Sequence, residues 1–208
     1  MPLLLIGGHT RNIGKTSLVV DLLRAFPDVS WTAVKITQYG HGVCSLHGEL
    51  CGCAPHEHPC SLTEEHDRSN HTDTSRFLVA GAARSLWLRA RQGQLAEALP
   101  LLRDALSCAS HAIIESNSLL SFLHPALYLA VLDPADADFK DSARLHLHRA
   151  DAFVLRTPLP ADSLAWPGVS SRLIHQKPHF YQPLGFSPPR PLLDFVRLRV
   201  FAIRGVSS

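Results

Sequence analysis

The feature that most constrains this chain is a glycine-containing segment near the amino terminus, between a short apolar run and an amphipathic run. Residues 3–6 are apolar throughout and lead into Gly7, which is typical of a buried parallel strand that opens into a loop. From residue 15 to residue 26 apolar side chains recur at helical spacing, and Pro27 ends the pattern. The sequence therefore predicts a strand, a loop and a helix in direct succession, which favours an α/β architecture.

The end of this loop carries the triplet Gly14-Lys15-Thr16 at the mouth of the predicted helix. At that position free backbone N–H groups and the positive end of the helix dipole bind an anion. A lysine there neutralises β- and γ-phosphate oxygens, and a threonine hydroxyl joins the Mg²⁺ shell. We therefore predict a P-loop that binds a nucleoside triphosphate through Asn12, Ile13, Gly14, Lys15, Thr16 and Ser17.

The loop departs from the usual pattern at its first position. His9 stands where the first glycine of the motif is expected, and Gly8 lies one residue too early. We expect the first turn of the loop to be shaped differently.

A P-loop also requires an acidic residue for the Mg²⁺ shell, usually at the end of a neighbouring buried strand. Glu115 ends the apolar run His-Ala-Ile-Ile-Glu, and we favour it as the magnesium ligand beside Thr16. The less favoured alternative is Asp133, which follows a second apolar run. Either acid has a structural alternative role as the cap of the turn that follows its strand.

Apolar periodicity along the rest of the chain alternates between strand and helix. Strands are predicted at residues 31–37, 85–89, 111–115, 127–132 and 152–155, and helices at 72–82, 95–108 and 141–149. The proline-rich stretch from residue 158 is expected to wrap the surface, with a last regular element at 192–203. This alternation predicts a single domain over residues 1–208, with a mostly parallel sheet covered by helices on both faces.

Composition excludes several classes of protein. A formal net charge of +2 is too small and too evenly spread for a nucleic-acid footprint, so we expect no nucleic-acid partner. No apolar run approaches the length of a membrane helix, and the amino terminus lacks the features of a signal peptide. We expect a cytoplasmic protein without a membrane partner.

Residues 39–71 break all periodicity and form a predicted insertion rich in cysteine and histidine. Thiolates and imidazoles suit Zn²⁺, and a structural metal would order a segment with few apolar residues of its own. We predict a zinc site made by Cys44, Cys51, Cys53 and Cys60.

Other arrangements of this segment stay open. One or two of His41, His47, His56 and His58 could replace cysteines as ligands. Four cysteines also suit an iron–sulfur cluster, the histidines suit a loading site for nickel or zinc, and the thiols of a loop can be incidental. The fifth cysteine, Cys108, lies on the periodic face of a predicted helix and is expected to be a small buried side chain.

Together these segments resemble the MobB group of P-loop proteins, which is linked to molybdopterin guanine dinucleotide biosynthesis. The resemblance is carried by residues 6–16, 33–37, 73–76, 79–82 and 113–115. It implies a GTP-binding adaptor beside a partner enzyme of cofactor maturation, in the same broad class as the nickel-chaperone GTPases. It also implies that Lys35 and Asp73 face the nucleotide pocket or the seam of a homodimer. The Cys/His insertion is not expected of that group.

Three functions remain open at this stage. The first is a slow, Mg²⁺-dependent GTPase or ATPase adaptor in molybdenum cofactor or related maturation, in which Lys15 stabilises the γ-phosphoryl charge and Glu115 or Asp73 orients water. The second is a metallochaperone that delivers zinc or nickel from the insertion. The third is a small-molecule kinase. The sequence contains no Asn-Lys-x-Asp guanine signature, so GTP over ATP follows from the resemblance alone.

Overall fold

The computed structural model describes residues 1–39, 60–160 and 166–201. Within these ranges one eight-stranded sheet runs in the order β3-β4-β2-β5-β1-β6-β7-β8. Its strands are β1 (Leu3–Gly8), β2 (Trp31–Tyr39), β3 (Cys60–Glu64), β4 (Arg84–Arg91), β5 (His111–Glu115), β6 (Leu127–Leu132), β7 (Ala152–Leu155) and β8 (His179–Tyr181). All neighbouring pairs are parallel except β3 with β4, so the prediction of a mostly parallel sheet is confirmed.

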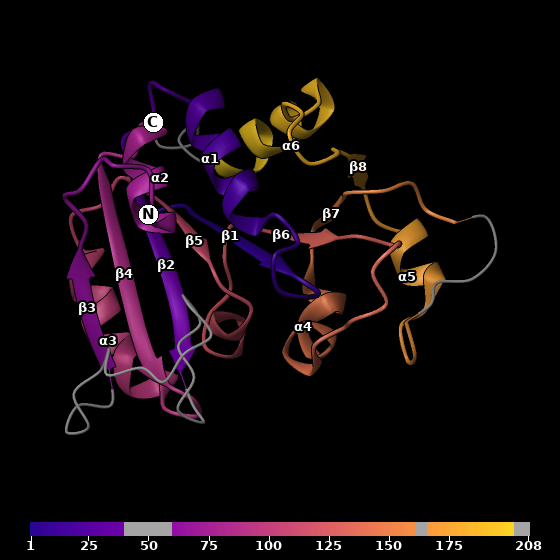
Figure 1. Cartoon of the computed structure of the whole chain (residues 1–208), viewed down its shortest axis with the longest axis horizontal. Coiled ribbons are helices and arrows are strands. Elements are labelled where there is room, and N and C mark those ends of the chain that lie inside the picture. Colours follow the sequence, from indigo (N-terminus) through magenta and orange to yellow (C-terminus); the bar gives the residue numbers. More distant parts are fainter. Residues whose placement is uncertain (40–59, 161–165, 202–208) are drawn as a thin grey trace, which may run out of the picture.

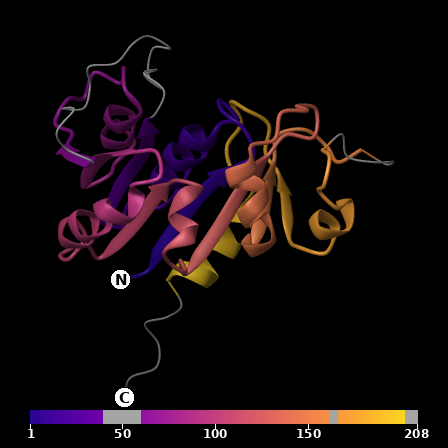
Figure 2. The ribbon, with the colours of Figure 1, turned by 90° about the horizontal axis from the view of Figure 1, so that it is seen from below.

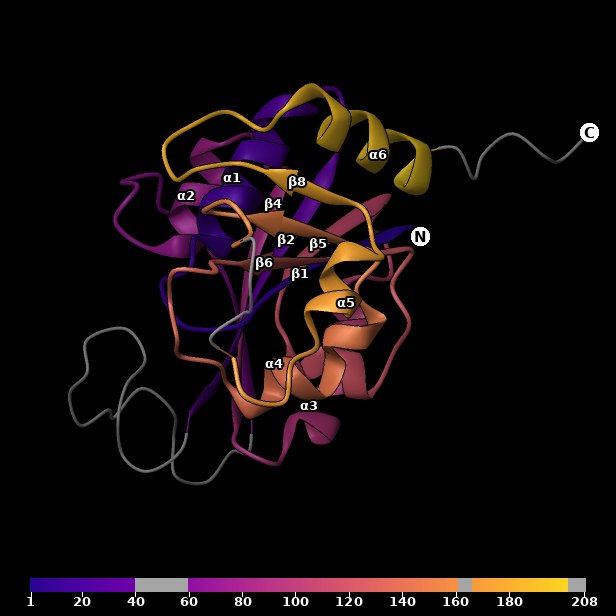
Figure 3. The same ribbon diagram turned by 90° about the vertical axis from the view of Figure 1, so that its right-hand side faces the viewer.

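Helices cover both faces of this sheet (Figures 1 and 3). The helical segments are α1 (Lys15–Ala25), α2 (Asp73–Val79), α3 (Leu95–Ala105), η1 (Ser118–Ser121), α4 (Asp141–His146), η2 (Leu147–Arg149), α5 (Ser171–His175) and α6 (Arg190–Val200). One buried cluster joins α1, α2 and α6 to one face of the sheet, and a second joins α3, α4, α5 and η1 to the other. No helix in the described ranges is long and apolar enough to cross a membrane.

The central strand β1 shows why the sequence folds into these layers. Its neighbours are β5 and β6, and Figure 2 shows this indigo strand near the middle of the sheet. Leu4 and Ile6 pack with the α1 layer, while Leu5 between them packs with the α3 layer. Because successive side chains of a strand point to opposite faces, a continuous apolar run fills both cores.

The structure corrects the sequence predictions in four places. The insertion predicted at 39–71 contains the edge strand β3, which pairs antiparallel with β4 so that Cys60 lies opposite Ala90. The proline-rich stretch contains α5 and the edge strand β8. Helix α3 ends at Ala105 instead of continuing to residue 108. Cys108 is therefore exposed, contrary to the prediction that it is buried.

The carboxyl ends of the parallel strands gather at one edge of the sheet. The loop after β1 leaves this edge, and β5 ends there at Glu115. Strand β2 also runs to this edge and ends at Tyr39, which lies opposite Arg91 of β4. In open α/β sheets ligands bind at this edge, so the fold brings the predicted site residues to the expected place.

Candidate nucleotide-binding site

The pairing of β1 with β6 continues one residue beyond Gly8, to His9, before the loop turns. The backbone N–H of His9 donates to the carbonyl of Val131 at 3.2 Å. The imidazole is buried, with ring centroids 5.2 Å from Phe139 and 5.0 Å from Trp166. A side chain is tolerated at this position because it packs into an aromatic cluster instead of facing the loop.

Asn117, two residues after the neighbouring strand β5, fixes the start of the loop. Its Nδ2 donates to the carbonyl of Gly8, and its Oδ1 accepts from the N–H of Gly8, both at 2.8 Å. A Cβ added at Gly8 would lie 2.7 Å from the side chain of Ile13, so glycine is required by close packing. Gly8, which lies one position before the first glycine of the usual motif, is therefore needed for the close packing of the loop.

Backbone conformation in the second half of the loop suits an anion site. Asn12 has φ 55° and Gly14 has φ 87°, both in the left-handed region. Gly14 is the N-cap of α1, whose first N–H groups have no acceptor within the helix. Left-handed residues alternating with helical ones turn successive N–H groups toward one concavity, which is a phosphate-binding arrangement.

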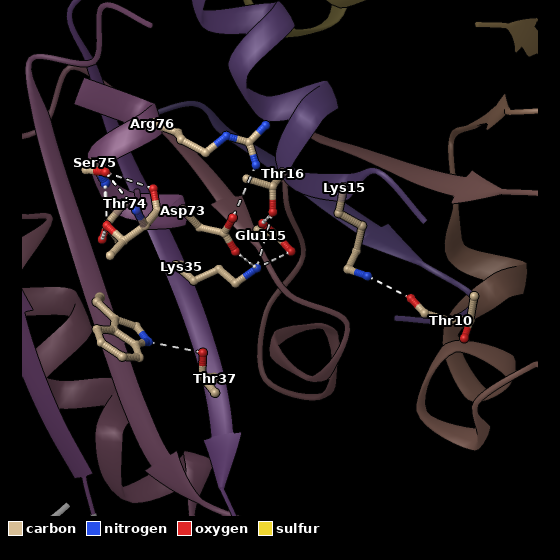
Figure 4. A network of polar contacts seen from close by, with 12 residues as sticks. Thr10, Lys15, Thr16, Lys35, Thr37, Asp73, Thr74, Ser75, Arg76 and Glu115 are labelled. Carbon is tan, nitrogen blue, oxygen red and sulfur yellow. Dashed lines mark hydrogen bonds and ion pairs between the residues drawn. The ribbon is translucent and has the colours of Figure 1, made fainter. Parts of the chain in front are cut away.

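Lys15 lies in the first turn of α1 and turns back over the loop. Its Nζ donates to the carbonyl of Thr10 at 2.8 Å (Figure 4). Burial lowers the pKa of Lys15 from its ordinary value to about 8, against the opposing charge of Glu115. A cation held at this cost gains most from a phosphate group that replaces a carbonyl as its partner.

Four side chains converge beside Lys15 from four different elements (Figure 4). The hydroxyl of Thr16 donates to Oε2 of Glu115 at 2.8 Å. Lys35 Nζ lies 2.5 Å from Oε1 of Glu115 and 2.9 Å from Oδ2 of Asp73, and it donates to Thr16 Oγ1 at 3.4 Å. The structure thus brings together Thr16 and Glu115, the two predicted magnesium ligands, with Lys35 and Asp73.

The position of Asp73 follows from a capping box at the start of α2. Oγ1 of Thr72 accepts from the N–H of Ser75, and Oγ of Ser75 accepts from the N–H of Thr72, both at 3.0 Å. This pair begins the helix one residue before Asp73, whose carboxylate then reaches Lys35. Arg76, one turn along the helix, lies 3.5 Å from the same carboxylate.

Oxygen donors at this point fit a magnesium ion. Mg²⁺ binds carboxylate and hydroxyl oxygens together with phosphate oxygens of a substrate. Here a hydroxyl of Thr16 and a carboxylate of Glu115 already meet around one cation, the ammonium of Lys35. The donor set therefore suits a hard cation.

These groups line a cavity of about 520 Å³. Its walls include every predicted nucleotide-binding residue except Ile13, whose side chain is buried beneath the loop. Lys140 and Ser142 line the side toward β6, whereas Thr37, Gln38 and Trp87 line the side toward β4. A volume of this size is in the range of small-molecule and cofactor sites.

Asp133, the alternative acid, does not line this cavity. Its carboxylate accepts from Thr157 Oγ1 at 2.6 Å and from the N–H of Ala135 at 3.0 Å. These contacts match the structural role of a strand-end acid that caps a turn. Glu115 is the acid that meets Thr16.

Three of the four predicted zinc ligands, Cys44, Cys51 and Cys53, lie outside the described residues, as do all four histidines considered as replacements. The fourth, Cys60, begins β3 with a partly buried free thiol. Among the residues that the structure describes, no group of three or more His, Cys, Asp or Glu side chains is placed to hold a metal ion.

Sequence reasoning missed several residues around the loop. Asn117 and Arg156 contact its backbone, and Lys140 and Arg76 line the cavity. A signal existed for Asn117 and Arg156, because each polar side chain closely follows a buried strand at the carboxyl edge of the sheet. The two cavity residues belong to helices or loops whose placement depends on tertiary packing.

No known family model matches the chain, and no curated protein sequence matches it either. The solved structures that are similar to it include three from different proteins. LpxK from Aquifex aeolicus in complex with ATP has 17% identity and a TM-score of 0.48, covering 87% of this chain and 53% of that one. HypB from Helicobacter pylori in complex with nickel has 16% identity and a TM-score of 0.50, covering 99% and 90%. A MobB protein homologue from Bacillus stearothermophilus has 14% identity and a TM-score of 0.38, covering 87% and 88%.

This chain spans about half of the LpxK chain that it matches. The likeness to HypB, at 16% identity and a TM-score of 0.50, concerns the fold alone. The chain has the fold of the P-loop NTPases.

Proposed function

We propose that this protein binds a nucleoside triphosphate with Mg²⁺ and hydrolyses it slowly. The observation that carries the proposal is the hydrogen bond of 2.8 Å between Thr16 and Glu115. It lies beside a loop that precedes a helix and has two residues in the left-handed backbone region. Each of these features has a separate role in phosphate chemistry, and all of them face one cavity.

In this proposal the chain's residues act mainly by position and charge. Backbone N–H groups of residues 12–17 hold the phosphates, and Lys15 exchanges the carbonyl of Thr10 for oxygens of the terminal phosphates. Thr16 and Glu115 hold Mg²⁺, which when bound neutralises charge on the β- and γ-phosphates.

Water is oriented by the remaining acid. Asp73 and Glu115 share the ammonium of Lys35, so the carboxylate that loses this contact has an oxygen free to accept from water. Asp73 is the more exposed of the two and is our choice for orienting the attacking water. Arg76 lines the same cavity and offers a further positive charge to the transferred phosphoryl group.

The biological role that we propose is an adaptor in molybdenum cofactor or related cofactor maturation. Its support is the sequence resemblance to the MobB group across the loop, the Lys35 strand, the Asp73 helix and the Glu115 strand. The proposal includes a partner enzyme and a homodimer, with zinc as a structural ion in the Cys/His-rich segment. GTP is preferred over ATP on the same resemblance.

A second candidate is a metallochaperone that delivers zinc or nickel. The observation that favours it is the point at which the Cys/His-rich segment leaves the sheet. Gln38 lines the cavity, Tyr39 ends β2, and the segment follows directly before the chain returns at Cys60. Binding of nucleotide and binding of metal would then be coupled through β2. HypB, whose fold this chain shares, was solved in complex with nickel.

The core proposal is tested by calorimetric titration of ATP and GTP with Mg²⁺ into the unsubstituted chain and Lys15→Ala. We expect Lys15→Ala to lower the affinity about a hundredfold or more, because a charge-assisted contact to phosphate is lost. Lys177→Ala is the matched control, since Lys177 Nζ also donates to backbone carbonyls but does not line the cavity. Equal affinity of Lys15→Ala and the unsubstituted chain would refute the proposal.

A further inference from the structure

Arg156 lies behind the phosphate loop, directly after β7, and only 4% of it is exposed. Its guanidinium donates from Nε to the carbonyl of Ile13 at 3.2 Å and from Nη2 to the carbonyl of Gly14 at 2.6 Å. From Nη1 it donates to the carbonyl of Gln182 at 2.9 Å. A guanidinium offers its donors in a fixed planar fork, so one side chain fixes three carbonyls in relation to one another.

The two loop carbonyls determine where the loop N–H groups point. In a trans peptide the C=O of one residue and the N–H of the next are fixed in one plane and point in opposite directions. With the carbonyls of Ile13 and Gly14 held on Arg156, the N–H groups of Gly14 and Lys15 face away from it. Gly14 and Lys15 line the cavity and Arg156 does not, so these donors are turned to the side on which phosphate would bind.

The surroundings of Gly14 leave little freedom for another arrangement. Its φ of 87° is left-handed, and an added Cβ would lie 2.9 Å from Nη2 of Arg156 and still closer to the side chain of Leu184. The segment after β8 is itself attached to α1, because Gln182 Nε2 donates to Asp21 Oδ2 at 2.9 Å. Arg156 thus connects the loop to a support formed by residues more than 140 positions away.

We propose that Arg156 is a positioning residue for triphosphate binding, which holds the loop in its anion-binding shape from the side opposite the ligand. The inference rests on the proposed function and deepens it. The binding of any polyphosphate to the loop should depend on this residue, because Arg156 orients backbone donors and contacts neither a base nor a sugar.

The test compares Arg156→Lys and Arg156→Met with the unsubstituted chain in calorimetric titrations of ATP with Mg²⁺ and of inorganic tripolyphosphate. Lysine keeps the charge but cannot hold two carbonyls in a fork, so we expect an affinity loss of about tenfold, equivalent to about 1.4 kcal/mol. We expect a larger loss for methionine, which removes the side-chain donor from both loop carbonyls and leaves that of Gly14 only the N–H of Leu18. Both ligands should be affected equally.

The titration distinguishes a positioning role from a purely structural one, because it gives the competent fraction and the dissociation constant separately. If Arg156 only supports folding, the fraction of competent molecules falls while the dissociation constant of that fraction is unchanged. Arg149→Lys is the matched control, because Arg149 also donates to backbone carbonyls, those of Leu120 and Leu123, away from the loop. It should leave the dissociation constant unchanged.

Two negative results have different meanings. If the unsubstituted chain binds neither ligand, the proposed function itself fails. If it binds them and both Arg156 variants bind with the same dissociation constant, the proposed function stands and the positioning role is overturned.

Discussion

Lys35 and Mg²⁺ are expected to compete for the same oxygens, which makes the magnesium affinity of the nucleotide-free protein a sharp test of the site. Burial works against the charged form of Lys35, but the carboxylates of Glu115 and Asp73 outweigh it and raise its pKa above the ordinary value. The side chain is therefore an ammonium ion throughout the neutral range. Lys35→Met removes this cation, keeps an unbranched side chain and releases both carboxylates.

The expected gain in affinity follows from the contacts that Mg²⁺ must break in the unsubstituted chain. The side chain of Glu115 is 4% exposed and that of Asp73 is 36% exposed. A buried contact to a charged group contributes about 1.5–3 kcal/mol, and an exposed ion pair about 0.5–1 kcal/mol. The sum is about 2–4 kcal/mol, so we expect Lys35→Met to bind Mg²⁺ roughly 30- to 700-fold more tightly.

The assay is a calorimetric titration of MgCl₂ into nucleotide-free protein, with Mn²⁺ as a spectroscopic probe of the same site. Lys140→Met is the matched control, because Lys140 lines the same cavity but has no contact with Glu115 or Asp73 among those that the structure describes. A thermal melt establishes that each variant is folded. If Lys35→Met and Lys140→Met bind Mg²⁺ equally, the reasoning is refuted.

Two further predictions concern proton and metal binding. Because burial lowers the pKa of Lys15 to about 8, the unfolded chain binds more protons than the folded chain between pH 8 and the ordinary lysine pKa, and the free energy of unfolding should rise with pH there. Urea unfolding should show Lys15→Met to be more stable at pH 7 by roughly 1–3 kcal/mol and without this rise, and a parallel pH dependence in both proteins would contradict the assignment. For the Cys/His-rich segment we expect about one zinc per chain by elemental analysis, reduced in Cys60→Ser but not in Cys108→Ser; a folded, metal-free protein would exclude the site. A structural zinc should survive dialysis against a mild chelator and its loss should unfold the segment, whereas a delivered ion should exchange in response to nucleotide.

The parts of the fold that the sequence predicted well are those with a strong local signal. Strands β5, β6 and β7 have the predicted bounds, since each is an apolar run that is buried on both faces. The edge strands β3 and β8 were missed because each is short and half exposed, so neither has a continuous apolar run. Cys108 was misplaced because the helical pattern continues in the sequence past Ala105, where α3 ends.

The residues of the site also differ in how strong a local sequence signal they have. The loop, Thr16 and Glu115 were predictable because a helix start and a strand end each have a sequence signature. For Arg156 and Asn117 the sequence offered only their place shortly after a buried strand. Their partners are backbone groups of residues more than 100 positions away, which no local pattern specifies. The packing of His9 between Phe139 and Trp166 has the same origin.

The placement of β3 has a consequence for how this protein can vary in evolution. Tyr39 and Cys60 lie opposite adjacent residues of β4, on either side of that strand, so the ends of the Cys/His-rich segment are about 9–10 Å apart, or two strand spacings. A few residues would bridge that gap, and each doubling of a loop adds only about 0.6 kcal/mol of closure entropy. The sheet therefore constrains neither the length nor the composition of the segment. At this edge the Cys/His-rich segment can be lengthened, shortened or exchanged while the rest of the sheet is inherited unchanged.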